Sequence, residues 1–329
     1  MVKISSTSPE AISSAAQILR DGGLVGMPTE TVYGLAANAK DGKAVARIFE
    51  AKGRPQFNPL IVHCASIEDV ETIAEINNAA RILGKYFWPG PLTMILPRKE
   101  NSGLSDLVSA GLPTVAVRIP AHKDALALIK AAGVPLAAPS ANKSGTLSPT
   151  TPKHVADSLG SAVDMILAAG PCKVGLESTV IDLSTSHPAV LRPGAVSAEE
   201  LSRILGQTVP YDAGDGENVK SPGQLLKHYA PGIPVRLNAI DLLPGEALLG
   251  FGSLRFMGIR GGGAALNLPE ESVRNLSENA DLHEAASNLF TMMRALDTPQ
   301  HKAIAVMNIP ENGIGKAIND RLERASRGT

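Results

Sequence analysis

The chain has 329 residues, of which 44% are hydrophobic, 19% are charged and 3% are aromatic. Thirty-one Lys and Arg against 32 Asp and Glu give a net charge of −1. With a mean hydropathy of +0.05, this balance disfavours a membrane protein and a general clamp for duplex nucleic acid. The two cysteines, Cys64 and Cys172, lie in unrelated contexts, so neither a disulfide framework nor a structural zinc site is expected. No secretory signal and no apolar run of ~18 residues occur, so a cytoplasmic setting without a membrane anchor is expected.

Segments with helical and strand character alternate through the first 205 residues. Pro9, after Ser8, opens a helix that ends at Gly22 and Gly23. Strands are predicted at 24–27, 60–63, 92–96, 114–119, 165–168, 180–183 and 190–192, and further helices at 44–51, 68–73, 78–86, 123–131, 152–158 and 198–204. This alternation predicts an α/β domain with a mixed sheet over residues 1–205.

The character of the sequence changes after residue 205. Residues 206–233 are rich in Gly, Pro, Asp and Asn and have little periodicity, so they are predicted to form an interdomain linker. Loops of this length are often functional. Beyond the linker, strands are predicted at 235–237, 247–251, 264–266 and 303–307, and helices at 281–296 and 316–325. A second, smaller α/β domain is therefore predicted over residues 234–329.

The familiar nucleotide-binding loops are absent from the sequence. No GxxxxGK[ST] occurs. The stretch that begins at Gly250 and Gly252 has Arg255 where the dinucleotide fingerprint needs a third glycine for close packing of helix and strand. No HExxH, GxSxG or protein-kinase motif set occurs either. A nucleotide bound by this chain must therefore be held by another scaffold.

Three arginines are followed by proline, immediately or after one residue: Arg54, Arg118 and Arg192. Proline cannot continue the ladder of a central strand, so a strand is expected to stop at each and to leave the arginine near the sheet edge. Ligands of α/β proteins favour the crevice at the carboxyl ends of strands, where converging guanidinium groups would bind phosphates and carboxylates. Taken singly, an arginine is more often a surface charge, and residues such as Thr29 and Ser144 are more often turn formers. The joint occurrence of these residues favours a site.

Read together, the polar segments resemble the YrdC-like domain of the threonylcarbamoyl-AMP synthase family. The matching motifs are PTETVYGL at 28–35, the KxR motif that begins at Lys52 and the SxN motif that begins at Ser140. The flanking motifs NPL, WPGPLT, VRIP, SGxxSPT, ESTVID and LRPGA occur in the family's order. The linker sequence SPGQLLKHYAP and the tail resemble, more loosely, the longer branch of the family with two domains. A related carbamoyltransferase of hydrogenase maturation has zinc-finger CxxC pairs, which this sequence lacks.

The resemblance implies both a fold and a reaction. The fold is an N-terminal domain with a twisted mixed sheet and a concave ligand cavity, followed by a smaller Rossmann-like α/β domain. The reaction converts L-threonine, bicarbonate and ATP to L-threonylcarbamoyladenylate and diphosphate, with Mg²⁺ held mainly by the phosphates and no residue assigned to the metal. A tRNA threonylcarbamoyl transferase complex then uses the product to modify tRNAs that read codons beginning with adenine, and a weak tRNA contact is compatible with this role.

The family's roles can be carried over to this sequence by motif position. Lys52 and Arg54 are implied as the catalytic residues, because fixed cations stabilise the charge that grows on phosphoryl oxygens. Arg118 would pair with the threonine carboxylate, and Tyr229 would close over the nucleotide as a lid. The implied threonine site consists of Thr31, His63, Arg118, Ala138 (through its backbone) and Ser178. The implied ATP site consists of Lys52, Arg54, Asn58, Thr114, Ser140, Asn142, Ser148, Arg192 and Tyr229.

Two alternative functions stay open at this point. A non-enzymatic RNA-binding module could use the same cationic edge, although the neutral net charge disfavours it. A related carbamoyl-adenylate enzyme could use the same scaffold, because the methyl group that separates threonine from serine is worth only about 1 kcal/mol. Two residues also have ordinary interpretations: His63 as a strand residue with satisfied hydrogen bonds, and Tyr229 as an anchor of the linker.

Overall fold

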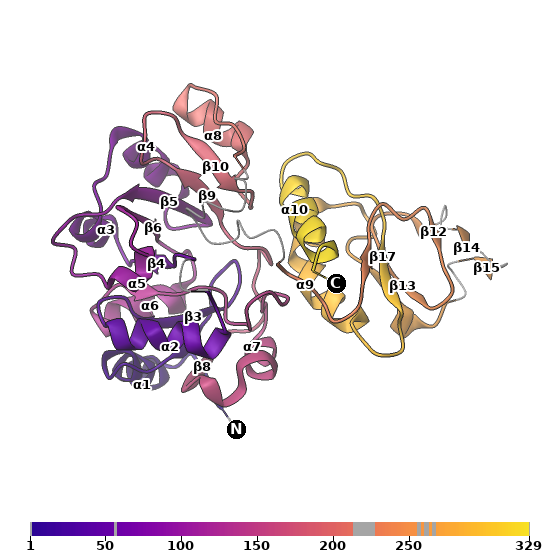
Figure 1. Ribbon diagram of the computed structural model, residues 1–329, viewed down its shortest axis with the longest axis horizontal. Coiled ribbons are helices and arrows are strands. Elements are labelled where there is room, and N and C mark those ends of the chain that lie inside the picture. Colours follow the sequence, from indigo (N-terminus) through magenta and orange to yellow (C-terminus); the bar gives the residue numbers. More distant parts are fainter. Residues whose placement is uncertain are drawn as a thin grey trace. The chain divides into compact units, whose positions relative to one another are not determined.

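The computed structural model describes residues 2–55, 58–212, 228–254, 258–259, 263–264 and 268–328. The chain divides into two units, drawn from indigo to yellow along the sequence in Figure 1. Unit 1 comprises Met1–Ser144, Pro149–Lys173 and Glu177–Leu225, and unit 2 comprises Gly145–Ser148, Val174–Leu176 and Leu226–Thr329. Two short segments that lie before residue 177 therefore belong with the C-terminal residues. The predicted boundaries at 205 and 233 stay predictions, since residues 213–227 of the linker lie outside the described residues.

Unit 1 is built on a ten-stranded mixed sheet with the strand order β1-β8-β2-β3-β7-β4-β6-β5-β9-β10. The pairs β1–β8, β2–β8, β4–β6 and β5–β9 are parallel, and the other neighbours are antiparallel. The mixed α/β class predicted from the sequence is therefore confirmed. The strands are β1 (Lys3–Ser6), β2 (Val25–Met27), β3 (Gly34–Asn38), β4 (Ile61–His63), β5 (Leu92–Pro97), β6 (Thr114–Arg118), β7 (Leu136–Ala137), β8 (Met165–Ala168), β9 (Thr179–Asp182) and β10 (Ala189–Arg192).

The helices of unit 1 begin at side chains that accept backbone N–H groups. Asp41, for example, accepts from the first turn of α2, and Gly53 ends that helix with a φ of 59°. This left-handed residue turns the chain between Lys52 and Arg54. The helices are α1 (Pro9–Arg20), α2 (Gly42–Lys52), α3 (Ile67–Ile73), α4 (Asn78–Phe87), α5 (Asp106–Ser109), α6 (Lys123–Ala132), α7 (Pro152–Leu159), the short 3-10 turn η1 (Gly160–Ala162) and α8 (Ala198–Leu205).

Helices cover the two faces of this sheet unequally. Alternate strand residues such as Val62 and Val117 join residues of α2, α4 and α8 in one apolar core on the first face. On the second face, α1 and α6 cover the half that contains β2, β3, β7 and β8, in a separate core. The other half of the second face has its own apolar cluster, which includes no residue of a described helix: Ile61, Ile95, Ala116, Val180 and Leu191, with Ala189 packed against it.

Several polar residues share this second face with the apolar cluster. The register pairs His63 with Leu136, which belongs to the core under α1 and α6, and also with Arg118. Because directly paired residues point to the same face of a sheet, His63 and Arg118 lie on the second face, where β4 and β6 end. We call the half of this face over β4, β5, β6, β9 and β10 the open half-face, since no described helix contributes to its cluster.

Unit 2 contains an all-parallel four-stranded sheet in the order β11-β17-β13-β16, with α9 and α10 packed on it. A parallel sheet with helices is the smaller Rossmann-like α/β arrangement that the sequence predicted. Residues 265–266 of the strand predicted at 264–266 lie outside the described residues. The elements are β11 (Val235–Arg236), β12 (Asp241–Leu242), β13 (Glu246–Gly250), β14 (Gly258–Ile259), β15 (Gly263–Ala264), η4 (Glu270–Ser272), β16 (Val273–Asn275), α9 (Leu282–Leu296), β17 (Ala303–Val306) and α10 (Gly315–Ser326).

A second, three-stranded sheet of unit 2 is formed by β12, β14 and β15. Across both units, the described residues include no helix that is long and apolar enough to cross a membrane.

Candidate active site

A buried ion pair lies at the carboxyl end of β6, on the open half-face. The Arg118 guanidinium donates hydrogen bonds to the carbonyl oxygen of Gly90 (3.1 Å), the hydroxyl of Thr31 (2.9 Å) and the carboxylate of Glu30 (2.5 Å). Arg118 is only 3% exposed and Glu30 is 8% exposed. Two predicted threonine-site residues, Thr31 and Arg118, are thus directly bonded. Sequence reasoning missed Glu30, although it lies inside the quoted PTETVYGL motif.

The protonation states of this cluster follow from its surroundings. Burial alone would raise the pKa of Glu30, but the Arg118 guanidinium and hydrogen bonds from Arg118 and the Ala121 N–H outweigh it and lower that pKa. Burial, with a further effect of Arg118, lowers the pKa of His63 to about 3, so its ring is neutral. The Nδ1 atom of His63 is buried and has no hydrogen-bond partner among the described residues. Such an orphaned atom calls for a partner, and none of the residues that the structure describes supplies one.

A second polar cluster joins predicted residues of both substrate sites. Arg192, at the end of β10, donates to the carbonyl oxygen and to the hydroxyl of Ser178, both at 3.1 Å. The Ser178 hydroxyl also lies 2.7 Å from the Thr93 hydroxyl. All three side chains are at most 4% exposed. Ser178, predicted for the threonine site, and Arg192, predicted for the ATP site, are therefore joined by hydrogen bonds beside the open half-face.

Lys52 ties the end of α2 to the loop that follows β7. Its ammonium group donates to the carbonyl oxygens of Ser140 and Asn142. In return, the Ser144 N–H donates to the Lys52 carbonyl oxygen at 2.8 Å. Burial lowers the pKa of Lys52 well below its ordinary value, and the charge of Arg54 lowers it further. Three predicted ATP residues, Lys52, Ser140 and Asn142, thus lie together, and Lys52 holds the loop.

The position of Arg54 contradicts the expectation that a strand ends at each arginine followed by proline. Arg54 follows α2 and not a strand, so the expectation that a strand stops at the Arg-Pro pair is correct for Arg118 and Arg192 and wrong for Arg54. Arg54 donates to the carbonyl oxygens of Asn58 (3.3 Å) and Pro59 (3.0 Å), which precede β4. The local cause is Gly53, whose left-handed backbone turns the chain away from the helix axis.

Thr114 and Asn58 lie near the amino ends of their strands, and Arg118 lies at a carboxyl end. Thr114 begins β6 and Arg118 ends it, so at ~3.3 Å per residue the two Cα atoms are about 13 Å apart. The side-chain oxygen of Asn58 is buried and has no partner among the described residues. Thr114 and Arg118 therefore lie at opposite ends of one strand, and their roles in binding ATP and threonine stay predictions. Ala138, at the β7 end, donates its backbone N–H to the Ile61 carbonyl oxygen at 3.0 Å.

Two predicted ATP residues, Ser148 and Tyr229, belong to unit 2. Tyr229 is 1% exposed, with a φ of 60°. Its ring lies 5.6 Å from the Phe290 ring, and the Arg321 guanidinium lies 5.3 Å from its centroid. These contacts agree with the interpretation of Tyr229 as a linker anchor. A lid role for Tyr229 and an ATP contact for Ser148 stay predictions.

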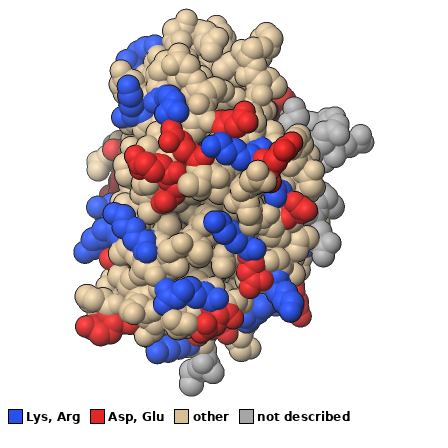
Figure 2. Space-filling view, turned by 90° about the vertical axis from the view of Figure 1, so that its left-hand side faces the viewer, with Lys and Arg blue, Asp and Glu red and all other residues tan. Residues whose placement is uncertain are grey.

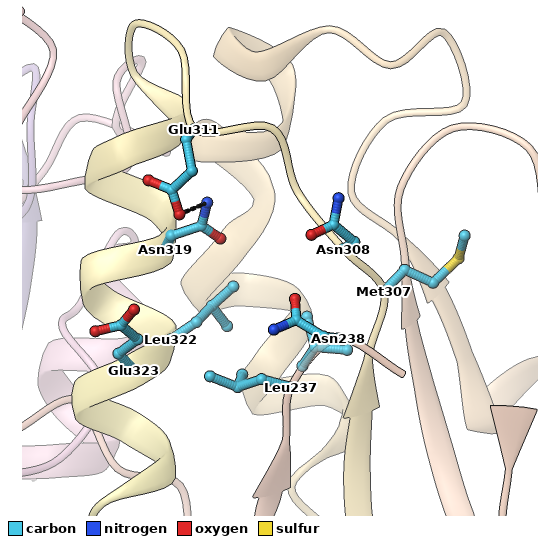
Figure 3. A pocket seen from close by; sticks show the side chains of 9 residues that line it. Leu237, Asn238, Met307, Asn308, Glu311, Asn319, Leu322 and Glu323 are labelled. Carbon is cyan, nitrogen blue, oxygen red and sulfur yellow. Dashed lines mark hydrogen bonds between the residues drawn. The ribbon is translucent and has the colours of Figure 1, made fainter. Parts of the chain in front are cut away.

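Unit 2 also has a pocket of about 120 Å³ where β11 and β17 end against α10 (Figure 3). Its residues include the carboxylates of Glu311 and Glu323, and Asn319 donates to Glu311 at 2.9 Å. No Lys or Arg occurs among the nine lining residues. This lining does not suit a triphosphate, so this pocket is not a candidate ATP site. Among the described residues, no group of three or more His, Cys, Asp or Glu side chains is placed to hold a metal ion.

Comparisons with known proteins match both halves of the chain. A family model described as "Telomere recombination" matches residues 17–194, and one described as "Threonylcarbamoyl-AMP synthase, C-terminal domain" matches residues 196–327. The threonylcarbamoyl-AMP synthase of Pyrococcus abyssi is 42% identical over 325 residues, covering 96% of this chain and 94% of the relative. That of Bacillus subtilis is 40% identical over 339 residues, covering 98% and 95%.

A solved structure shows the same arrangement of elements. The crystal structure of Sua5 from P. abyssi, complexed with L-threonine, has a TM-score of 0.87 and 38% identity, and the match covers all of this chain and 97% of that one. The full length of the match includes the motifs from PTETVYGL to LRPGA as well as the C-terminal unit. The chain therefore belongs to the threonylcarbamoyl-AMP synthase family, in its two-domain form.

Proposed function

We propose that the protein is a nucleotidyltransferase that converts L-threonine, bicarbonate and ATP to L-threonylcarbamoyladenylate and diphosphate. The observation that carries this proposal is the buried Arg118 cluster with the orphaned His63 nitrogen beside it. ATP is a substrate of the family to which the chain belongs. L-threonine is the ligand of the similar P. abyssi structure.

The threonine carboxylate binds to Arg118. Among the described residues, this guanidinium uses three of its five N–H groups, for Gly90, Thr31 and Glu30, which leaves two for a substrate. Two parallel N–H donors bind a carboxylate in a fixed orientation. The neutral His63 ring accepts a hydrogen bond from the substrate at Nδ1, which removes the cost of a buried unpaired nitrogen.

The chemistry then joins three anions in one place. The threonine ammonium loses a proton to solvent water, the amine adds to the bicarbonate carbon, and water leaves to give a carbamate. A carbamate oxygen attacks the α-phosphorus of ATP, and diphosphate leaves. Arg54 and Arg192 stabilise the growing phosphoryl charge, and Lys52 holds the 140–142 loop in place. Proximity is the other contribution, because the carbamate is held beside the nucleotide.

The remaining parts of the proposal concern the metal, the partners and the location. Mg²⁺ accompanies ATP and is held mainly by its phosphates. The adenylate passes to a tRNA threonylcarbamoyl transferase complex in the cytoplasm, with a weak tRNA contact at most. Acidic and basic side chains are interspersed on the face drawn in Figure 2, so this face lacks the continuous basic patch that an RNA clamp would need.

The experiment is diphosphate release from the purified protein, with threonine and bicarbonate omitted in turn. Release that needs threonine, bicarbonate and ATP together supports the proposal, and release without threonine or bicarbonate contradicts it. An RNA-binding module would show salt-sensitive RNA affinity and no release. A related carbamoyl-adenylate enzyme would turn over serine, or another amino acid, faster than threonine.

A further inference from the structure

Glu30 lies inside the proposed threonine site, where no role has been assigned to it. One carboxylate oxygen is 2.5 Å from an Arg118 nitrogen, and the other accepts the Ala121 N–H at 3.1 Å. The contact with Arg118 is buried, with side-chain exposures of 4% for Arg118 and 10% for Glu30, and the contact with Ala121 is partly buried. The carboxylate, on the turn after β2, is thus held by the end of β6 and by the segment that follows β6.

The summed charge of the proposed threonine site depends on Glu30. With a neutral His63, Arg118 alone would give the site a charge of +1, and any small carboxylate would satisfy it. An ionised Glu30 brings the summed charge of Glu30, His63 and Arg118 to zero. A buried charge without compensation is costly, so the preferred ligand is one whose own charges also sum to zero.

We infer that Glu30 makes the threonine pocket select a zwitterionic α-amino acid over carboxylates that lack an amine. The inference rests on the proposed function. The substrate carboxylate takes the two remaining N–H groups of Arg118, and the ammonium balances the charge of Glu30. Glu30 also discourages bicarbonate, the second substrate and itself an anion, from occupying Arg118 in place of threonine. Glu30 is therefore a specificity-determining residue.

The test compares two ligands by titration calorimetry without ATP: L-threonine, and 3-hydroxybutyrate, which keeps the carboxylate, hydroxyl and methyl groups but has no amine. In Glu30→Gln, threonine should bind ~10-fold or more weakly, and 3-hydroxybutyrate should bind as well as before or better. The ratio of the two affinities should therefore fall at least ~10-fold. A merely structural role for Glu30 would weaken both ligands alike, so an unchanged ratio overturns the inference.

Two further variants and one measurement on the unaltered protein complete the test. Glu30→Asp keeps the negative charge and should keep the ratio of the affinities for threonine and 3-hydroxybutyrate, even if both ligands bind more weakly. A fall of this ratio in Glu30→Asp contradicts the inference. Glu71→Gln, which removes an exposed acid 2.8 Å from Arg81, should leave both affinities unchanged. In the unaltered protein, bicarbonate should not displace threonine, and displacement would overturn the inference even if Glu30→Gln fails to fold. If the unaltered protein binds no threonine, the proposed function fails; if it binds threonine and only the ratio is unchanged, the inference alone fails.

Discussion

The substitution Arg118→Lys tests whether Arg118 serves threonine binding and not ATP binding, and it keeps the positive charge at this position. Lysine keeps a positive charge beside Glu30, so no buried carboxylate is left without a counter-charge. It cannot reproduce the guanidinium fork that now reaches Gly90, Thr31 and Glu30 and leaves two N–H groups for a ligand. The loss of one charge-assisted hydrogen bond to the substrate, about 1.5–3 kcal/mol, predicts a KM for threonine that is ~10- to 150-fold higher.

The assay is diphosphate release with threonine varied at saturating ATP and bicarbonate, and then with ATP varied at saturating threonine. We expect the KM for ATP to stay within about threefold of the original value, because Arg118 lies about 13 Å from Thr114 at the other end of β6. Arg47→Lys is the matched control, since Arg47 forms an exposed ion pair with Asp164 at 3.1 Å. An unchanged KM for threonine, or an equal rise for both substrates, would refute the separate roles.

Four further predictions follow from the same structure. Arg54→Ala should raise the KM for ATP ~10- to 150-fold and leave threonine binding unchanged in calorimetry; equal effects on both substrates would contradict the assignment. Burial raises the pKa of Cys64 and Cys172 to about 12, so both thiols should resist iodoacetamide at pH 8 in the folded protein and react after unfolding, as mass spectrometry can check. Gly175 has a φ of 78°, and a Cβ there would lie 2.5 Å from a backbone oxygen of α9, so Gly175→Ala should lower the free energy of unfolding by about 1–3 kcal/mol in urea titrations. Because the pKa of His63 is lowered from 6.5 to about 3, the unfolded chain takes up a proton between these pH values that the folded chain does not. Stability should therefore fall as the pH falls from 6.5 towards 3, and His63→Gln should flatten this part of the curve; a curve that keeps its slope would contradict the neutral ring.

The elements that the sequence predicted well are those with a strong period and clear ends. The helix opened by Ser8 and Pro9 is present as Pro9–Arg20, and the apolar run at 92–96 is present as Leu92–Pro97. The strand Gly34–Asn38 was missed, because it is buried on both faces and its small residues show no alternation. Lys3–Ser6 was missed as well, since this strand pairs only with β8 at the edge of the sheet and is mostly exposed.

The candidate site was predictable as a set of residues but not as a set of contacts. The motif order identified Thr31 and Arg118. It did not identify Glu30, which accepts a hydrogen bond from Arg118 although the two are 88 residues apart along the chain. No local pattern encodes a pair at that separation. The proline argument failed for Arg54 because a glycine that ends a helix also produces a sharp turn. The neutral state of His63 depends on burial and on Arg118, which only the folded chain brings together.

The central claim is that one hollow of the protein joins threonine, bicarbonate and ATP. The most direct measurement is mass spectrometry of the nucleotide product formed from ¹³C-bicarbonate, unlabelled threonine and ATP. We expect a threonylcarbamoyl adenylate that is one mass unit heavier than the product of unlabelled bicarbonate and that is absent when threonine is omitted. A nucleotide product without the label, or labelled product that forms without threonine, would contradict the account.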